Sequence, residues 1–336
     1  SIEERMNGIE KNQRSANYRK GSFQNLSETP VMAKDSSWLK VIKDSLNRPK
    51  AVRPSVPLPS VKTDLRNLHS ENPEIIWFGH SSYLIHIRGK NILVDPVFSG
   101  HASPLPFLIR AFDGTDIYTP NDLPPIDLMI LTHNHYDHLD AGTLALLRDK
   151  TLAWCMPLGV SASIQKLHAT AVTELDWWET AQITKDIEIT ATPARHFSGR
   201  GLKRGGSLWC SFVLNIFGYT LYIGGDSGYD THFKAIGEKF GEFDLAVLEC
   251  GQYNTSWPLI HMMPEETVQA SIDLQAKWLL PVHWGKFSLA NHPWNEPVAR
   301  AVKKAAELNV RITTPMIGEP VIINNYYPGK VWWDMQ

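Results

Sequence analysis

Residues 133–138 (HNHYDH) constrain what this chain can fold into more than any other segment of its sequence. Four metal-capable side chains stand within these six residues, in the pattern H-x-H-x-D-H: His133, His135, Asp137 and His138. Imidazole nitrogens and carboxylate oxygens are ordinary zinc ligands. Four ligands are more than one ion normally takes from a single segment, so the pattern predicts two metal ions side by side. The alternative, a polar loop that is rich in histidine by chance, does not account for the spacing.

The flanking residues place this segment between a strand and a helix. Residues 126–131 are a short apolar run after Pro124 and Pro125, which is typical of a buried strand. Residues 143–147 carry a helical pattern. The metal-capable side chains are therefore expected at the C-terminal end of a strand, where open α/β sheets place their functional sites.

Three more metal-capable residues each follow a strand-like run further along the chain. A single histidine after a strand is more often a structural residue, and Gly-Gly-Asp is more often a turn, so each signal is weak alone. Together with residues 133–138 they complete a ligand set for two ions. They are His196 after 187–191, Asp226 after 219–223 and His283 after 278–282.

The order of these motifs resembles that of the metallo-β-lactamase superfamily, including Asp95 at a strand end. Within it, residues 72–310 resemble the N-acylphosphatidylethanolamine-hydrolysing phospholipase D family. The superfamily motif is specific for the metal site but not for the substrate. The narrower resemblance rests on 77–82 (WFGHSS), 94–98 (VDPVF), 123–127 (LPPID), 133–140 (HNHYDHLD), 174–179 (ELDWWE), 225–229 (GDSGY), 243–246 (FDLA), 264–266 (PEE) and 283–291 (HWGKFSLAN).

The resemblance implies two divalent metal ions, with Zn²⁺ favoured and Mn²⁺ or Fe²⁺ as alternatives. A water or hydroxide would form a second bridge between them beside a carboxylate. The implied ligands are His133, His135 and His196 for the first ion, Asp137, His138 and His283 for the second, and Asp226 as the bridge.

By resemblance, Asp137, Asp226 and His261 are the residues assigned to catalysis. The two aspartates are implied metal ligands, and a histidine at the His261 position lies near the metals and substrate in the family. Asp95 is expected to orient a ligand imidazole through the other ring N–H, with a strand-end turn before proline as the alternative. His80 is expected either to orient a ligand or to be a buried, hydrogen-bonded histidine.

The resemblance implies a phosphoric diester hydrolase of the phospholipase D type, in which hydroxide activated by both metals attacks phosphorus. N-acylphosphatidylethanolamine-like or smaller phosphodiesters would be the substrates. A lactonase or another hydrolase on the same site is one alternative, and a nuclease is a weaker one. A non-hydrolytic scaffold or di-iron redox protein is the third, although di-iron relatives usually carry glutamate where this chain has His135.

Length and composition fit an enzyme with a large core. The chain has 336 residues, of which 43% are hydrophobic, and it has no run of 18 apolar residues that could span a membrane. Its three cysteines do not make a disulfide framework and are expected to be small buried hydrophobic residues. A cytoplasmic or peripheral membrane location is expected. Because the sequence starts at Ser1 without Met, removal of an N-terminal segment and export stay open.

Charge divides the chain into a basic N-terminal extension, residues 1–66, and a catalytic domain, residues 67–336. The extension carries 13 Lys or Arg against 7 Asp or Glu, whereas the rest carries 20 against 28. The Pro-rich stretch 48–59 is expected to be extended. The extension is interpreted as an arm packed on the acidic body, with contact to anionic lipid as the alternative. No nucleic-acid partner is expected, and nothing in the sequence specifies an oligomeric state.

From residue 72 onward strand and helix patterns alternate, which predicts an α/β fold. By resemblance this is a four-layer αββα sandwich with the metals at one edge between two sheets. The predicted strands are 75–78, 83–87, 91–94, 128–131 and 152–156, then 187–191, 208–216, 220–223, 245–248 and 279–282; the predicted helices are 160–167, 231–236, 264–274 and 296–308.

Two apolar loops, 104–112 and 252–263, are candidates for choosing the substrate. Both could hold an acyl chain, because ligand sites are lined mostly by apolar side chains. The alternative is that the two loops simply cover the core.

Overall fold

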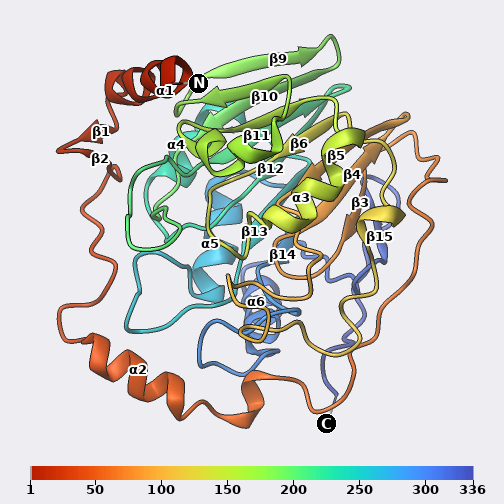
Figure 1. Ribbon diagram of the computed structural model, residues 1–336. Coiled ribbons are helices and arrows are strands. Elements are labelled where there is room, and N and C mark those ends of the chain that lie inside the picture. The colour runs from red at the N-terminus through yellow and green to blue at the C-terminus, as the bar shows by residue number, and fades with distance from the viewer. Residues whose placement is uncertain (1, 336) are drawn as a thin grey trace.

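Figure 1 shows the computed structural model, in which residues 2–335 are described and two β-sheets lie between outer helices. Within these residues, one sheet has seven strands and the other has six. In spatial order, the first comprises β15 (Pro320–Ile322), β3 (Glu74–Trp77), β4 (Tyr83–Ile87), β5 (Lys90–Val94), β6 (Leu128–Ile130), β7 (Trp154–Pro157) and β8 (Val172–Leu175). The second comprises β14 (Leu279–Val282), β13 (Leu245–Glu249), β12 (Tyr219–Ile223), β11 (Ser211–Ile216), β10 (Ile187–Thr192) and β9 (Thr180–Thr184).

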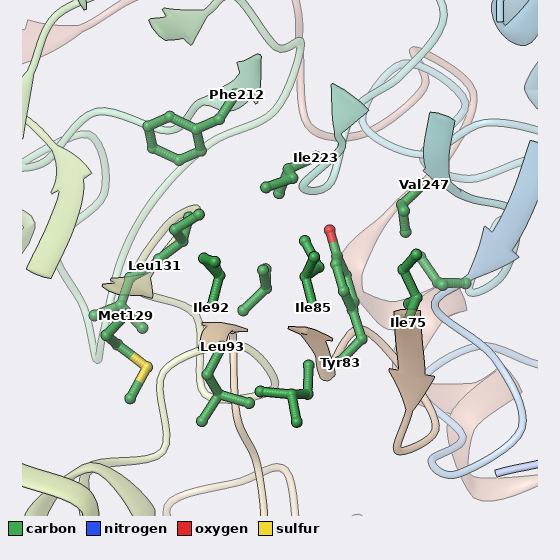
Figure 2. Close-up of a cluster of buried hydrophobic side chains, with 14 of the residues drawn as sticks. Ile75, Tyr83, Ile85, Ile92, Leu93, Met129, Leu131, Phe212, Ile223 and Val247 are labelled. Atoms are coloured by element: carbon green, nitrogen blue, oxygen red, sulfur yellow. The ribbon is translucent and has the colours of Figure 1, made fainter. Parts of the chain in front are cut away.

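The inner faces of the two sheets pack against each other. Figure 2 shows Ile85 and Ile92 of the first sheet pointing toward Ile223 and Val247 of the second. These side chains are at most 1% exposed. Burial of one such aliphatic side chain contributes about 1.5–3 kcal/mol, so this layer holds the sheets together.

Helices cover the outer face of each sheet. On the first sheet, Leu144 and Leu147 of α3 (Ala141–Leu147) join the same apolar cluster as the strands. On the second, α4, α5 and α6 pack with Tyr222 and Ala246 in a separate cluster. Their bounds are α4 (His232–Phe240), α5 (Pro264–Asp273) and α6 (Glu296–Glu307). The layer order confirms the predicted αββα sandwich.

Strand β8 at one sheet edge, strand β9 at the edge of the other sheet and the short β15 were not predicted from the sequence. Strand β9 alternates exposed and half-buried residues, so it lacks the apolar run that marked the buried strands. The predicted strand 208–216 begins only at Ser211, and residues 160–167 form a 3₁₀ helix, η4 (Val160–Leu167), not an α-helix. The remaining short helices are η1 (Lys50–Val52), η2 (Pro120–Asp122) and η3 (Arg148–Lys150).

The N-terminal extension runs across the body of the protein, and Figure 1 shows its helices in red and orange at the outside. It contains α1 (Ile2–Arg14), the short strands β1 (Tyr18–Arg19) and β2 (Ser22–Phe23), and α2 (Trp38–Leu46). Phe23, Leu58 and Leu65 are buried in the main core cluster, whereas α2 has no buried residue.

No helix within residues 2–335 has the length and apolar character that crossing a membrane requires. The three cysteines, Cys155, Cys210 and Cys250, are free and buried, as predicted.

Candidate metal centre

The segment 133–138 leaves the carboxyl end of β6 and turns into α3. The backbone N–H groups of His138 and Leu139 both donate to the carbonyl of His135, which closes a tight turn. The carboxylate of Asp140 then accepts hydrogen bonds from Gly142 N and Thr143 N and caps α3. This local structure directs several metal-capable side chains to one edge of the sandwich.

The other predicted ligands reach the same edge from the second sheet. His196 follows β10, Asp226 follows β12 and His283 directly follows β14. Strands β12, β13 and β14 are parallel, so their carboxyl ends lie together. The structure thus brings together all seven side chains that the sequence singled out.

One group of ligand atoms belongs to His133, His135, His196 and Asp226, and these atoms all lie within 4.8 Å of one another. Nε2 of His196 is 3.2 Å from Nδ1 of His135. Oδ2 of Asp226 is 3.6 Å from Nε2 of both His133 and His196. This group matches the set implied for the first ion together with its bridge.

A second group contains Asp137, His138 and His283, with His80 as a fourth member. Oδ2 of Asp137 lies 3.3 Å from Nε2 of His138 and 3.9 Å from Nε2 of His283. Asp226 reaches this group too, because its Oδ2 is 3.0 Å from Nε2 of His138. Asp226 therefore lies between the two groups, as a bridging carboxylate would.

Buried side chains behind the ligands hold them in place. Nδ1 of His138 lies 2.7 Å from Oδ2 of Asp95, whose carboxylate also accepts from Thr132 N and Oγ1. Nε2 of His80 lies 2.8 Å from Oδ2 of Asp137, and Oγ of Ser81 lies 2.8 Å from Nδ1 of His283. Such partners fix the orientation of metal ligands.

The donor atoms fit divalent cations. Nε2 of His133, Nε2 of His283 and Oδ1 of Asp226 are buried without a hydrogen-bond partner among residues 2–335. A buried polar atom left unpaired costs about 1–3 kcal/mol, and a coordinated cation would remove that cost. The three orphaned atoms belong to ligands assigned to the first ion, the second ion and the bridge.

Electrostatics favour neutral imidazoles at four of the candidate ligands and ionised carboxylates beside them, whereas the carboxylates of Asp226 and Asp137 overcome burial and raise the pKa of His138 well above its ordinary value. Burial lowers the pKa of His133, His196 and His283, and it lowers the pKa of His135 to about 4. Burial opposes the charge of Asp226, but the surrounding imidazoles, His138 above all, hold its pKa well below the ordinary value. Neutral nitrogens with free lone pairs are the form that binds a metal.

His261 extends the site on its open side. Nδ1 of His261 lies 2.7 Å from Oε2 of Glu249, whose other oxygen accepts from Ser227 N at 2.7 Å. Burial would lower the pKa of His261, but the carboxylate of Glu249 raises it to about 9. Burial also raises the pKa of Glu249, so the pair retains a proton at neutral pH.

A cavity of about 440 Å³ opens onto these residues. Ala102 to Pro104 and Ile109 line one part of it, and Trp257 and Ile260 line another. The loops 104–112 and 252–263 therefore contribute to the cavity, but Met262 packs in the core. Some residues of these loops therefore line the cavity, whereas others cover the core. The full set of metal-site residues that line it is His135, Asp137, His196, Asp226, His261 and His283.

Sequence reasoning assigned no role to several side chains that support the site, among them Glu249 and Asn25. Glu249 is the last residue of β13, so a carboxylate at the end of a buried strand was the available signal. Asn25 of the N-terminal extension bonds the backbone of His196, with Nδ2 to O at 2.7 Å and Oδ1 to N at 3.0 Å. No local pattern marks Asn25, because its partner lies 171 residues away.

Comparison with known protein families matches residues 90–284 to a family described as the Beta-lactamase superfamily domain. Among sequence relatives, an uncharacterized protein of Mycobacterium tuberculosis is 36% identical over 96% of this chain and 88% of the relative. A protein of Caenorhabditis elegans named N-acyl-phosphatidylethanolamine-hydrolyzing phospholipase D 1 is 31% identical over 71% of each chain.

A solved structure shares the fold. Igni18, described as a metallo hydrolase from the archaeon Ignicoccus hospitalis, superposes with a TM-score of 0.56 at 19% sequence identity. The match covers 74% of this chain and 97% of Igni18.

Proposed function

Since the chain belongs to the metallo-β-lactamase superfamily and is a metal-dependent hydrolase, we propose that it hydrolyses phosphodiesters in the manner of a phospholipase D. The proposed substrate is an N-acylphosphatidylethanolamine-like lipid or a smaller phosphodiester, and the products are a phosphate monoester and an alcohol. The relative from Caenorhabditis elegans, which is named for that activity, supports this choice.

The observation that carries the proposal is the cavity of about 440 Å³ that ends on the candidate metal centre. Its floor is made of imidazoles and carboxylates, whereas Val31, Met32, Ile109 and Ile260 are among its apolar wall residues. A substrate with a polar phosphodiester and an apolar arm matches this division. Each buried methylene would contribute about 0.8 kcal/mol to binding.

We assign two divalent cations, with zinc favoured, to the two groups of ligand atoms around Asp226. Bound there, the cations would supply a water of lowered pKa and positive charge for the phosphodiester oxygens. The chain's own contribution is to hold seven ligands rigidly. Asp95, His80 and Ser81 do so through the hydrogen bonds to His138, Asp137 and His283.

His261 is the proposed proton donor in this site. Its Nδ1 is occupied by Glu249, so the Nε2 side of the ring is left for a substrate in the cavity that His261 lines. A protonated imidazole there would donate a hydrogen bond to a phosphodiester oxygen and transfer the proton to the leaving oxygen. General acids of this kind contribute about 10²–10⁴-fold to rate.

The proposed function implies contact with a lipid surface when the substrate is an N-acylated phospholipid. The exposed α2 helix and Pro104 both lie near the cavity, since Trp38, Val41 and Pro104 are among its lining residues. We propose peripheral contact with an anionic membrane and no nucleic-acid partner.

The decisive experiment compares kcat/KM for a short soluble phosphodiester, an N-acylated glycerophospholipid and a simple lactone. We expect phosphodiester cleavage, with the acylated substrate favoured. Lactone turnover without phosphodiester cleavage would identify a lactonase instead. Equal rates for the short and acylated phosphodiesters would keep the chemistry and remove the lipid specificity.

Metal analysis tests the dinuclear assignment separately. Elemental analysis after loading with zinc is expected to give two ions per chain, because seven ligands exceed the four that one tetrahedral zinc takes. One ion or none per chain would contradict the assignment even if hydrolysis were observed.

A further inference from the structure

A second cavity, of about 460 Å³, lies beside the one that leads to the metal centre. Ile109 lines both, so the two cavities are neighbours on the same face. The second cavity differs in its charge, because three of its lining residues are arginines and only one is acidic. The lining residues are Arg48, Arg53, Phe107, Ile109, Arg110, Ala111, Asp113 and Ser288.

Neutral oxygens hold two of these guanidinium groups in place. Arg48 donates to Ser288 Oγ at 2.8 Å and to Asn291 Oδ1 at 3.2 Å, and it also donates to the carbonyl of Ala290. Arg53 donates to the carbonyls of Arg110 and Ala111 at 2.9 and 3.1 Å. Their positions are therefore set without any neutralising carboxylate.

The third guanidinium, that of Arg110, has no hydrogen-bond or ion-pair partner among the described side chains, those of residues 8–335. Among the side chains of residues 8–335, no Asp or Glu lies within 4 Å of the charged nitrogens of Arg48, Arg53 or Arg110, although Asp113 shares the cavity. Arg48 and Arg53 are like charges at one cavity and therefore repel each other; burial first, and then the charge of Arg53, lower the pKa of Arg48. An anion between them would relieve that repulsion.

Arginine suits a phosphate group in particular. Its planar guanidinium presents donors in a fork that matches two phosphate oxygens. Three such groups around one hollow, with no acid paired to any of them, form a site for a group with several anionic oxygens.

Exposed apolar side chains lie in or next to the segments that carry these arginines. In the loop beside Arg110, Phe107 is 71% exposed. In α2, which ends two residues before Arg48, Leu39 is 80% and Leu46 is 81% exposed. Amphipathic helices with basic residues lie in the interface of anionic bilayers in this way, and α2 also carries exposed Lys40 and Lys43.

We propose that Arg48, Arg53 and Arg110 bind the phosphate of an anionic phospholipid headgroup while α2 and residues 104–108 lie in the same bilayer surface. This inference rests on the proposed function in one respect: the metal cavity would then open toward the lipid that supplies its substrate. The bound headgroup is a docking ligand and is not itself cleaved.

The test measures binding to vesicles of phosphatidylcholine alone and of phosphatidylcholine mixed with phosphatidylglycerol. Arg110→Ala is the main variant, because its side chain contacts no partner whose loss would disturb folding. We expect its affinity for the mixed vesicles to fall roughly fivefold, which is the effect of one cation near an anionic bilayer. Arg110→Glu should weaken binding further, and Arg311→Glu is the matched control.

Arg311 is also exposed, but it lies beside the start of β14, whereas His283 follows the end of that strand. Reversing the charge at this position with Arg311→Glu should leave vesicle binding unchanged apart from a small effect of net charge. Equal losses for Arg110→Glu and Arg311→Glu would overturn the site and leave only nonspecific attraction. The proposed site would also be overturned if the protein bound strongly to vesicles of phosphatidylcholine alone and the Arg110 variants bound them equally well.

Two further measurements separate this inference from its alternatives. Inorganic phosphate at millimolar concentration should not displace the protein from mixed vesicles; displacement that requires Arg110 would assign the site to a soluble phosphate. Turnover of a short soluble phosphodiester should be the same in Arg110→Ala and the unmodified protein. If no phosphodiester is cleaved but vesicle binding still depends on Arg110, the proposed function fails and the headgroup site stands.

Discussion

The side-chain amide of Asn25 bonds both backbone groups of His196, donating to its carbonyl and accepting from its N–H. Asn25 belongs to the N-terminal extension, whereas His196 is a candidate ligand of the first metal ion. Oδ1 of Asn25 also accepts from Nε1 of Trp209. The extension is therefore built into the support of the metal centre, in addition to packing on the surface of the body.

Asn25→Ala is expected to lower metal affinity and kcat by about tenfold, because His196 would lose the hydrogen bonds that hold its backbone. Gln24→Ala is the matched control, since the side-chain amide of Gln24 donates to the carbonyl of Arg19 and to Oγ of Ser22, both within the extension itself. Zinc titration and steady-state kinetics measure both variants. Equal effects of the two substitutions would show that Asn25 acts only through the folding of the extension.

Asp226→Ala is expected to abolish most of the activity and to lower the number of bound metals below two. Its carboxylate lies within 3.6 Å of His133, His138 and His196, so it joins the two groups of ligands. We expect kcat to fall by at least a hundredfold. Asp149→Ala, at an exposed position outside the site, should retain both metals and full activity. Retention of two metals and normal turnover in Asp226→Ala would rule out the bridge.

Glu249→Gln tests the role assigned to His261. Glutamine keeps the shape of Glu249 and can still accept from Ser227 N, but it removes the charge that raises the pKa of His261. We expect kcat to fall by roughly tenfold to a hundredfold with little change in KM. The alkaline limb of the kcat profile should also move to lower pH. A change confined to KM would place the pair in substrate binding.

His232 is expected to make the protein sensitive to acid. Burial lowers its pKa to about 4, from an ordinary value of 6.5. The unfolded chain therefore binds a proton between these values that the folded chain does not, so stability is lost as pH falls from 6.5 toward 4. The full decrease in the free energy of unfolding from this group is about 3 kcal/mol.

The measurement is urea unfolding of His232→Asn across this pH range. The variant should lose less stability on acidification than the unmodified protein, whatever its stability at neutral pH. His168→Asn is the control, because His168 is exposed and sits in a left-handed backbone conformation that asparagine tolerates. Parallel pH curves for all three proteins would exclude His232 as a source of acid sensitivity.

The buried strands were predictable because a strand covered on both faces must be apolar along its whole length. β3 to β7 and β11 to β14 were found in this way, and β10 was found from its alternating β-branched residues, with errors of a few residues at the strand ends. Strands β8, β9 and β15, each at the edge of a sheet, were not, because an edge strand with one solvated face carries a weaker pattern. Their places depend on neighbouring strands that the local sequence does not reveal.

The candidate ligands were accessible from the sequence for a related reason. Each of His133, Asp226 and His283 stands just beyond a strand, and carboxyl ends of parallel strands share an edge. A rule about strand ends therefore brings together residues that are far apart in the chain. It cannot find Asn25, because that residue lies in an extended segment with no regular pattern around it.

The sequence by itself determined the α/β class and the seven candidate ligands, because these depend on local periodicity and short motifs. The sandwich and the edge where the ligands meet were implied by the resemblance to the superfamily. Only the tertiary structure decided which side chains support the ligands, how the cavity is walled, and where the arginines of the extension meet the loop at Arg110. Those relationships join segments with no shared local pattern. A single sequence does not reveal which distant segments lie close in space, because that depends on how the two sheets pack and on the course of the extension.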